Sequence, residues 1–298
     1  MAANLRLRDA VVACVNSSLR DLQLLPSSVK TFPIGDGSGS GMDPKKGERD
    51  YLKSPLRDEI AGLPSSVAEE RGIGGADLIP VIVSGGHGCG SGAGPALVND
   101  LSRRYPEALV MAFSTLPLAY EGEGVAKRAW EALKRLRESA AATPVDNQYI
   151  AEAHRLTDAP ITVLFDHINR RIAGTLSAML KSMTSAAVKT IDSSDLRRGL
   201  GRGVFLPLFW RLPGPEALPE LDRYDGAGFA RLAKAGGGRH RVFVILDTAS
   251  PVTPSQLEGM RDAIQRMLNA RIDVKDAIVR GYEKRVSLTL LIGGVSLW

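Results

Sequence analysis

Apolar residues along the chain form short continuous runs that alternate with segments of helical period. Leu78–Ser84 and Ala108–Thr115 are apolar and include β-branched residues, which is typical of buried strands, and Val11–Ser17 is a shorter run of the same kind. Between and after them, Pro95–Tyr105 predicts a helix with proline in its first turn, and Val125–Ser139 predicts an amphipathic helix. This alternation predicts a parallel sheet with right-handed crossovers.

A long helix is predicted over about Val163–Ala187, because apolar residues recur there at every fourth position. The repeating residues are Leu164, Ile168, Ile172, Leu176 and Leu180. The elements predicted beyond it are strands at Val204–Trp210, Arg241–Asp247 and Arg285–Ile292, and helices at Phe229–Ala235 and at Pro254–Leu268 with Thr253 as a cap. The order predicts an α/β domain, a connecting helix and a smaller α+β domain.

Composition narrows the class of protein. The 298 residues are 44% hydrophobic and 24% charged, which is ordinary for a globular chain. No apolar run approaches the roughly 18 residues of a membrane span, so none is expected. Two cysteines, Cys14 and Cys89, are too few for a disulfide scaffold or a four-cysteine zinc site, which favours the reducing cytoplasm. A net charge of only +5 with 5% aromatic residues argues against a nucleic-acid groove.

The strongest chemical signal is a glycine-rich loop between a predicted strand and a predicted helix. Ser84–Pro95 reads SGGHGCGSGAGP, with six glycines in twelve residues. Glycine lets backbone N–H groups converge and lets a ligand approach closely. The helix N-terminus that follows adds the positive end of its dipole. Both features suit a phosphate group.

Three kinds of phosphate loop compete for this segment. A P-loop requires Lys and then Ser or Thr after the last glycine, and neither stands there. A dinucleotide fingerprint fits loosely from Gly88, but the acid expected at the end of the next strand is missing, and the next acid is Glu121. A dinucleotide-dependent enzyme is therefore the weakest hypothesis. The third kind is the phosphate loop of the tubulin/FtsZ superfamily.

The loop resembles the tubulin/FtsZ signature Gly-Gly-Thr-Gly-(Ser/Thr)-Gly, with Cys89 in place of the usual threonine and His87 in place of a usual glycine. Upstream, Gly39–Pro44 resembles the family's Gly-Ala-Gly-Ala-Asn-Pro loop, which faces the γ-phosphate. Downstream, Tyr120-Glu121-Gly122 resembles Phe-Glu-Gly, whose Glu contacts the ribose. The family's next Arg has no clear counterpart, although Lys127 and Arg128 lie nearby.

Three later segments continue the resemblance in the same order. Asn147 resembles the Asn that reads the guanine edge. Phe165 and Asn169, one helical turn apart, resemble the aromatic residue that stacks on guanine and the Asn that bonds it. Thr190–Leu196 resembles the Asn-x-Asp-x-x-Asp loop that enters the next subunit's nucleotide site, with Thr190 in place of Asn. The resemblance implies that Asp192 and Asp195 orient the hydrolytic water.

The resemblance covers about Val11 to Gly294 and implies an FtsZ-like or CetZ-like GTPase. The implied fold is a parallel Rossmann-like GTPase sheet, a long central helix and an α+β domain with a mixed sheet, at residues 1–162, 163–195 and 196–298. The implied cofactors are GTP and Mg²⁺, the partner is the same chain in a head-to-tail polymer, and the role is cell division or cell shape. The implied nucleotide-binding residues are Gly41, Met42, Gly86, His87, Gly88, Cys89, Gly90, Ser91, Gly92, Glu121, Asn147, Phe165 and Asn169, and no metal ligand is identified.

The chain also departs from the family pattern. Val15-Asn16-Ser17 resembles the family's Val-Asn-Thr segment. The family has a strand, a first glycine-rich loop and a helix before that segment, whereas this chain starts almost at it, so the GTP-binding domain is expected to be N-terminally incomplete. The linker and partner-binding tail of FtsZ have no counterpart after the last predicted strand. This second departure favours a shorter FtsZ-like or CetZ-like relative over an ordinary division FtsZ. The missing first glycine-rich loop, Cys89 and Thr190 support an alternative hypothesis, a non-hydrolysing filament or scaffold protein with a degenerate nucleotide site.

Overall fold

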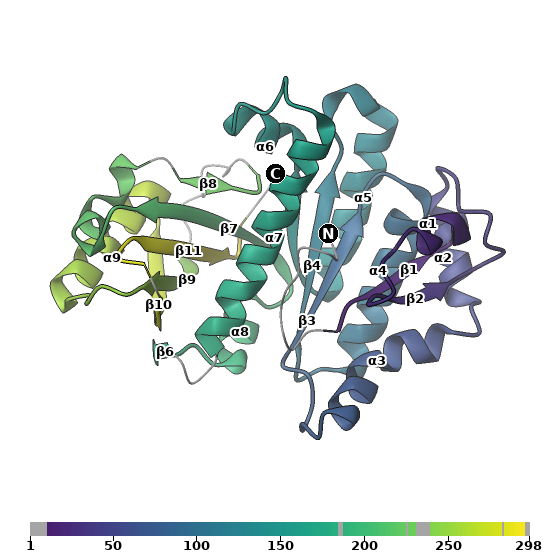
Figure 1. The fold of residues 1–298 in the computed structure, drawn as a ribbon, viewed down its shortest axis with the longest axis horizontal. Helices are drawn as coiled ribbons and strands as arrows, with labels where there is room; N and C mark the ends of the chain where they lie inside the picture. The colour runs from purple at the N-terminus through teal and green to yellow at the C-terminus, as the bar shows by residue number, and fades with distance from the viewer. Residues whose placement is uncertain (1–10, 184–186, 225, 231–238, 282, 296–298) are drawn as a thin grey trace. The chain divides into compact units, whose positions relative to one another are not determined.

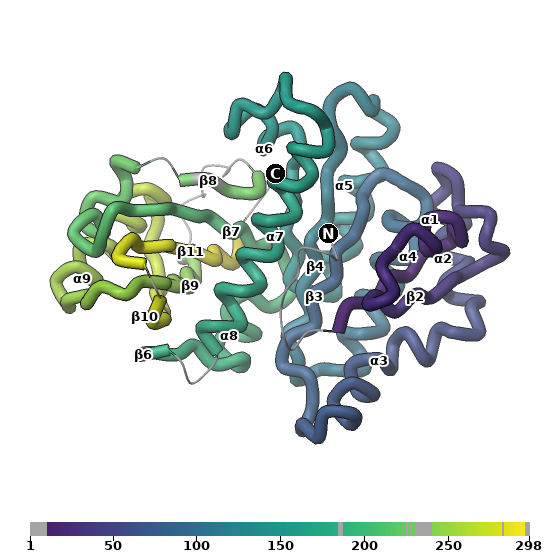
Figure 2. Tube along the Cα trace, viewed as in Figure 1, coloured from purple at the N-terminus to yellow at the C-terminus, as the bar shows by residue number. Residues whose placement is uncertain are grey.

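The computed structural model describes residues 11–183, 187–224, 226–230, 239–281 and 283–295 (Figure 1). The chain divides into two compact units, with the boundary between Ala173 and Gly174. That boundary lies inside helix α7 (Ile161–Met183), which Figure 2 shows as one continuous stretch of the trace. The assignment of functions to residues 1–162, 163–195 and 196–298 stays a prediction.

The first unit is built on parallel strands. Strands β3 (Leu78–Ser84), β4 (Leu109–Leu116) and β5 (Ala141–Asp146) pair in parallel in that order. Strands β1 (Ala13–Asn16) and β2 (Lys30–Pro33) form a second, two-stranded parallel sheet. Seven of the eight residues of β4 are buried, as expected for a strand covered on both faces of a parallel sheet.

Helices connect these strands as the alternation in the sequence predicts. Helices α4 (Gly88–Arg104) and α5 (Glu123–Ser139) link β3 to β4 and β4 to β5. Ala129, Leu133 and Leu136 of α5 are buried, which confirms the predicted apolar face. The remaining helices of the unit are α1 (Leu19–Gln23), α2 (Pro44–Leu52), α3 (Arg57–Glu70), the 3-10 helix η2 (Ala119–Glu121) and α6 (Asn147–Ala153).

The start of α4 differs from the sequence prediction. The predicted helix began at Pro95, whereas α4 begins at Gly88 and contains Pro95 in its interior. The glycines lower helix propensity, but they also allow close packing. A Cβ on Gly92 would lie 2.0 Å from the carbonyl oxygen of Pro44 on α2. A Cβ on Gly90 would lie 2.0 Å from the carbonyl oxygen of Ser84. Tertiary packing therefore overrides local propensity here.

Other boundaries also differ. Helix α7 ends at Met183 and Ala187 begins strand β6, so the predicted continuation of the helix to Ala187 is wrong. Most of the predicted helix at Phe229–Ala235 lies outside the described residues. Strands β2, β5 and β10 and helices α2, α6 and α8 were not predicted from the pattern.

The second unit contains a mixed sheet in the order β7-β11-β9-β10-β6, with β8 beside β7. Strands β9 and β10 are parallel, whereas β11 runs antiparallel to β7 and β9. This arrangement confirms the predicted α+β character. The elements are β6 (Ala187–Lys189), α8 (Ser193–Leu200), β7 (Gly203–Leu212), η3 (Pro215–Arg223), β8 (Ala227–Gly228), β9 (Arg239–Thr248), α9 (Pro254–Leu268), β10 (Arg271–Arg280) and β11 (Val286–Gly293).

Helix α9 anchors the core of this unit. Thr253 caps it by accepting a hydrogen bond from the backbone N–H of Gln256, and the Gln256 side chain accepts one from the N–H of Thr253, which confirms the predicted cap. Met260, Ile264 and Leu268 pack into one buried cluster with the strands and with η3. The sheet therefore has a well-filled core on the α9 side.

Candidate functional site

The predicted nucleotide-binding residues follow the carboxyl ends of the parallel strands. The glycine loop from Gly85 follows β3, Glu121 follows β4, and Asn147 is the first residue of α6 after β5. Because the carboxyl ends of parallel strands lie at one edge of a sheet, these three segments converge there. Such an edge is the usual ligand site of an open α/β sheet.

The two glycine-rich loops meet at the start of α4. The backbone N–H of Gly88 donates to the carbonyl of Gly41 at 3.1 Å. A Cβ on Gly88 would lie 2.6 Å from that oxygen, and one on Gly47 would lie 2.3 Å from the carbonyl oxygen of Gly88, so only glycine fits at this contact. Met42, the next residue of the Gly41 loop, is 49% exposed. The structure therefore brings Gly41 and Gly88 together with Met42 open to solvent.

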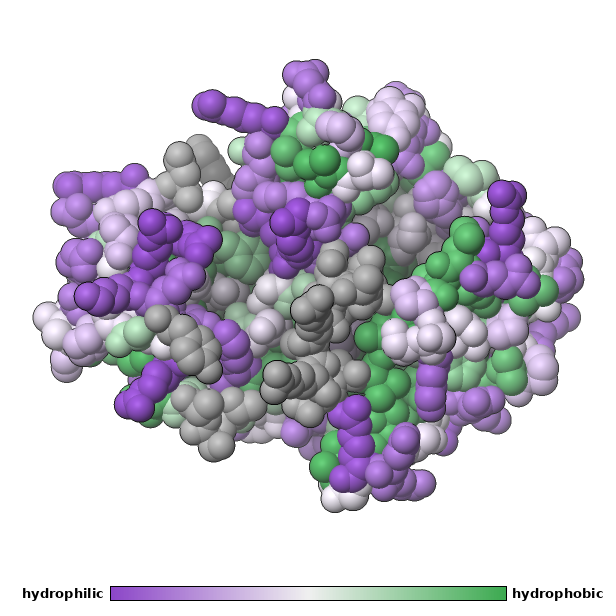
Figure 3. Space-filling model, in the orientation of Figure 1, coloured by the Kyte–Doolittle hydropathy of each residue, from purple (hydrophilic) through white to green (hydrophobic). Residues whose placement is uncertain are grey.

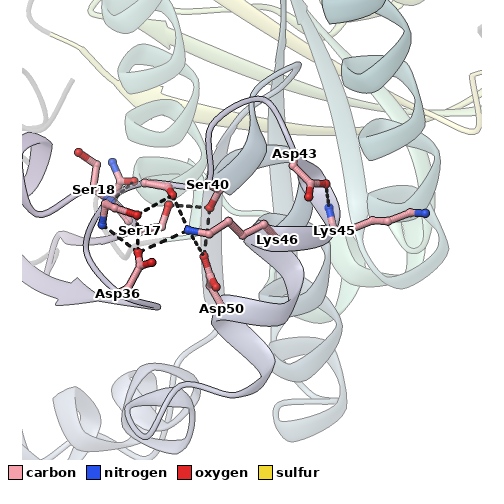
Figure 4. Close-up of polar contacts among 11 residues, drawn as sticks. Ser17, Ser18, Asp36, Ser40, Asp43, Lys45, Lys46 and Asp50 are labelled. Carbon is pink, nitrogen blue, oxygen red and sulfur yellow. Dashed lines mark hydrogen bonds and ion pairs between the residues drawn. The ribbon is translucent and has the colours of Figure 1, made fainter.

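Lys46 holds the Gly35–Gly41 loop in shape (Figure 4). Its ammonium donates to the carbonyl of Gly39 at 2.6 Å and forms ion pairs with Asp36 at 3.4 Å and Asp50 at 3.5 Å. The buried hydroxyls of Ser17 and Ser40 lie 2.7 Å apart, and that of Ser40 donates to Asp50 at 3.4 Å. The sequence offers no pattern that distinguishes Lys46 from any surface lysine.

The loop after β3 is fixed from two sides. Arg128 on α5 donates from Nε to the carbonyl of Gly86 at 2.8 Å, and the N–H of Gly86 donates to the hydroxyl of Ser91 at 2.8 Å. Ser91 is buried, so its hydroxyl shapes the loop. Arg128 is one of the two basic residues near the expected position of the family's Arg. Its guanidinium donates a hydrogen bond to the backbone of the glycine loop.

His87 and Glu121 face each other at the entrance to this loop. His87 Nε2 lies 3.8 Å from Glu121 Oε2, while Glu121 Oε1 accepts a hydrogen bond from the N–H of Leu118 at 2.8 Å. His87 occupies the N-cap of α4 without a side-chain cap hydrogen bond. The N-terminus of α4 is thus not capped by a side chain, and it can take an anion.

Cys89 is mostly withdrawn from solvent in the first turn of α4. Burial raises the pKa of its thiol, with hydrogen bonding to Ser17 acting in the opposite direction. The thiol is therefore neutral near pH 7 and adds no negative charge near a bound phosphate. A nucleophilic role for Cys89 finds no support in this geometry.

Asn147 is a buried polar residue of the site. Its side chain is 7% exposed, and its Oδ1 is buried without a hydrogen-bond partner among the described residues. The side chain of its neighbour Gln148 accepts from the N–H of Ala119 at 3.1 Å, which joins α6 to the turn carrying Glu121. An unpartnered buried amide oxygen costs free energy unless a ligand or water donates to it.

The first half of α7 carries Phe165 and Asn169. Phe165 is 43% exposed, and Ile161 and Val163 are exposed to a similar degree. Figure 3 shows apolar side chains gathered at the surface over the start of this helix. In the described part of the chain, no hydrogen bond, ion pair or ring contact joins Asn147 to Phe165 or Asn169.

A histidine pair lies between α6 and α7. The rings of His154 and His167 have centroids 4.5 Å apart, and Arg171 donates from Nε to His167 Nε2 at 2.9 Å. Burial, followed by the charge of Arg171, lowers the pKa of His154 to about 4. Both factors lower the pKa of His167 as well. The pair is therefore neutral at pH 7 and packs α6 against α7.

Asp192 and Asp195 lie in the second unit at the start of α8. Asp192 is the N-cap, and its Oδ1 accepts from the N–H of Asp195 and from the hydroxyl of Ser194, both at 2.7 Å. Asp195 forms ion pairs with Arg198 at 3.0 Å and with Lys275 on β10. Both carboxylates thus have partners in their own chain.

The described part of the chain contains neither a cluster of metal ligands nor a membrane-spanning helix. No group of three or more His, Cys, Asp or Glu side chains there is placed to hold a metal ion. None of the helices there is long and apolar enough to cross a membrane.

Comparison with known proteins gives one consistent result. Residues 67–154 match the family model described as the GTPase domain of the tubulin/FtsZ family. The tubulin-like protein CetZ of Pyrococcus abyssi is 27% identical over 223 residues, which cover 72% of this chain and 59% of that protein. The cell division protein FtsZ 2 of Halobacterium salinarum is 24% identical over an alignment of 302 positions, which covers 98% of this chain and 72% of that protein. The chain thus spans about 59% of the length of the Pyrococcus relative.

Solved structures share the fold. CetZ2 from Haloferax volcanii, in a GTPγS-bound protofilament, has a TM-score of 0.76 at 24% identity and aligns over 96% of this chain and 84% of its own. An empty FtsZ dimer from M. jannaschii has a TM-score of 0.72 at 19% identity, over 98% of this chain and 84% of its own.

Proposed function

Because the chain belongs to the tubulin/FtsZ superfamily, whose members include cytoskeletal GTPases, we propose that it binds GTP at the carboxyl edge of β3, β4 and β5 and hydrolyses it on self-assembly. The observation that carries the proposal is the convergence of three post-strand segments at this edge, one of which holds the buried, unpartnered amide oxygen of Asn147.

The residues present fit a guanine nucleotide. The N-terminus of α4 suits the phosphates, because the positive end of a helix favours an anion. Gly41 and Met42, on the adjoining loop, are proposed to face the terminal phosphate. Mg²⁺ would be held mainly by phosphate oxygens and water, as is usual for this ion in nucleotide sites.

The sugar and base are assigned to the two following segments. Glu121, held by the N–H of Leu118, is proposed to contact the ribose. Asn147 supplies amide groups for the guanine edge, and Phe165 and Asn169 on α7 supply a ring for stacking and a second amide.

Hydrolysis is proposed to require a second copy of the chain. The carboxylates of Asp192 and Asp195 would act on the nucleotide of a neighbouring subunit, where hydrolysis chiefly needs a positioned water and charge stabilisation. CetZ2 from Haloferax volcanii is described as a protofilament and the M. jannaschii FtsZ as a dimer, which supports self-association. A head-to-tail contact that does not close generates an open filament, with a role in cell shape or division in the cytoplasm.

Equilibrium binding tests the nucleotide site. We expect calorimetric titration to show that GTP binds more tightly than ATP, and Asn147→Ala to weaken GTP binding by about tenfold, because the base loses one hydrogen-bonding partner. Asn99→Ala is the matched control, since Asn99 is exposed on α4 and accepts only from Ser139 among its described contacts. Equal affinity for both nucleotides, or no effect of Asn147→Ala, would remove guanine recognition from the proposal.

A non-hydrolysing scaffold is the second candidate. The observation that favours it is the engagement of Asp195 with Arg198 and Lys275 in its own chain. Tight GTP binding and filament formation without phosphate release, at every protein concentration, would establish this second function in place of the first.

A further inference from the structure

The glycine-rich loop at the start of α4 carries one basic side chain of its own. Ser84–Pro95 contains His87 but neither lysine nor arginine. Of the basic residues on adjoining elements, Arg128 donates to the carbonyl of Gly86 at 2.8 Å, and Lys46 donates to the carbonyl of Gly39 at 2.6 Å. His87 is therefore the side chain of this loop that can bring a positive charge to a ligand.

The imidazole ring of His87 is open to solvent and faces a carboxylate. Its side chain is 50% exposed, and it makes no cap hydrogen bond although it is the N-cap of α4. Nε2 lies 3.8 Å from Oε2 of Glu121, whose Oε1 accepts from the N–H of Leu118 at 2.8 Å. Since both ring nitrogens carry hydrogens in the imidazolium form, the ring can donate to Glu121 with Nε2 and to an anion with Nδ1.

Charged groups of both signs surround this loop. Of these, Glu121 forms an ion pair with His87 in the described part of the chain. The thiol of Cys89 is neutral near pH 7, because burial raises its pKa. The charged side chains on the elements packed around the loop are Glu121 of η2, Glu123 and Arg128 of α5, and Asp43, Lys45 and Lys46 at the start of α2.

We propose that His87, as an imidazolium, contacts a phosphate oxygen of the bound nucleotide, and that the affinity of the site for nucleotide therefore rises as the pH falls. This inference rests on the proposed GTP site and adds a means of regulation to it. The glycine that is usual at this position of the tubulin/FtsZ signature has no side chain that could act in this way.

The sign of the effect follows from linkage between protons and nucleotide. Imidazole is the side chain whose charge changes between about pH 5 and pH 8. A phosphate beside the ring favours the charged form, so nucleotide binding takes up a proton, and protonation strengthens nucleotide binding by the same factor. Because the ring is half exposed, solvent weakens this contact, and we expect a gain in affinity of about fivefold between pH 8 and pH 5.5.

Calorimetric titration of the full chain with GTP across this pH range tests the inference. His87→Gln should lose the gain in affinity at low pH, whereas His87→Lys should bind GTP at about pH 8 roughly fivefold more tightly than His87→Gln. Titrations in buffers of different ionisation enthalpy should show that the wild type takes up more protons on binding than His87→Gln. The terminal phosphate of GTP ionises in the same range, so the difference between the two proteins is what reports on His87.

Lys127→Gln is the matched control. Lys127 is exposed on α5, and lysine stays charged throughout this pH range. The substitution therefore removes a nearby charge that does not titrate, and the pH dependence of GTP binding should remain that of the wild type.

The same pH dependence in the wild type and in His87→Gln would overturn the inference. It would also be overturned by a His87→Lys protein that binds GTP at pH 8 no more tightly than His87→Gln. Both results leave the proposed GTP site standing, whereas a wild-type protein that binds GTP at no pH in this range would refute the proposed function itself.

Discussion

The close contact between α2 and α4 reverses the effect that a glycine-to-alanine substitution normally has on stability. Replacing a glycine inside a helix by alanine normally stabilises a protein by about 1 kcal/mol. Gly92 is such a glycine, but a Cβ there would lie 2.0 Å from the carbonyl oxygen of Pro44 and 2.6 Å from the backbone nitrogen of Glu48. Cβ contacts below 3.0 Å essentially do not occur, so α2 must move away by about 1 Å.

Moving α2 away from α4 lowers the stability of the folded protein. Overpacking of this kind costs about 1–3 kcal/mol. It also strains the hydrogen bond from the buried Tyr51 hydroxyl to Asp100, which is 2.9 Å long and joins the same two helices; loss of such a bond costs about 1–3 kcal/mol. With the propensity gain subtracted, Gly92→Ala should lower the free energy of unfolding by about 1–5 kcal/mol.

Gly174→Ala is the matched control. Gly174 lies inside α7, and a Cβ there would meet nothing within 4 Å outside the backbone of its own helix. This variant should raise the free energy of unfolding by about 1 kcal/mol. Urea denaturation followed by circular dichroism measures both changes. A Gly92→Ala protein as stable as wild type would refute the close helix contact, and a destabilised Gly174→Ala protein would refute the reasoning from propensity.

Two further predictions concern buried polar groups. Asp100→Ala removes the acceptor of both Tyr51 and Arg57 and should lower the free energy of unfolding by about 1–3 kcal/mol in urea denaturation; an unchanged midpoint would contradict the network. His154, with its pKa lowered to about 4, is neutral in the folded protein but protonates near pH 6.5 when unfolded, so unfolding takes up a proton between these values. Stability should therefore fall as the pH falls from about 6.5 to 4, and His154→Gln should flatten this slope; an equal slope in both proteins would contradict the assignment.

Strong periodic segments could be predicted from the sequence. The strand at Leu78–Ser84 and the helix at Pro254–Leu268 have the predicted bounds, because a buried strand and a capped amphipathic helix each carry a local signal. Helix α4 could not be placed from its glycines, because the reason they are helical is the packing of α2 against them. Strand β10 (RIDVKDAIVR) was missed because its charged residues form ion pairs with β6 and α8 that only the tertiary structure shows.

The candidate site could also be predicted only in part from the sequence. Gly88, Glu121 and Asn147 were assigned to one site from the resemblance to the tubulin/FtsZ order of motifs, whereas strand β5, which brings Asn147 to the same sheet edge, was not predicted. The residues that support them could not be found in this way, because Lys46, Arg128 and Lys275 are ordinary basic residues in sequence and gain their roles from distant partners.

The most direct test of the account is the rate of GTP hydrolysis per subunit as protein concentration is raised. The site is proposed to be completed by Asp192 and Asp195 of a second copy, so the rate per subunit should rise with concentration and level off as filaments form. A rate per subunit that is the same at every concentration would show that one chain is sufficient and would contradict the shared site.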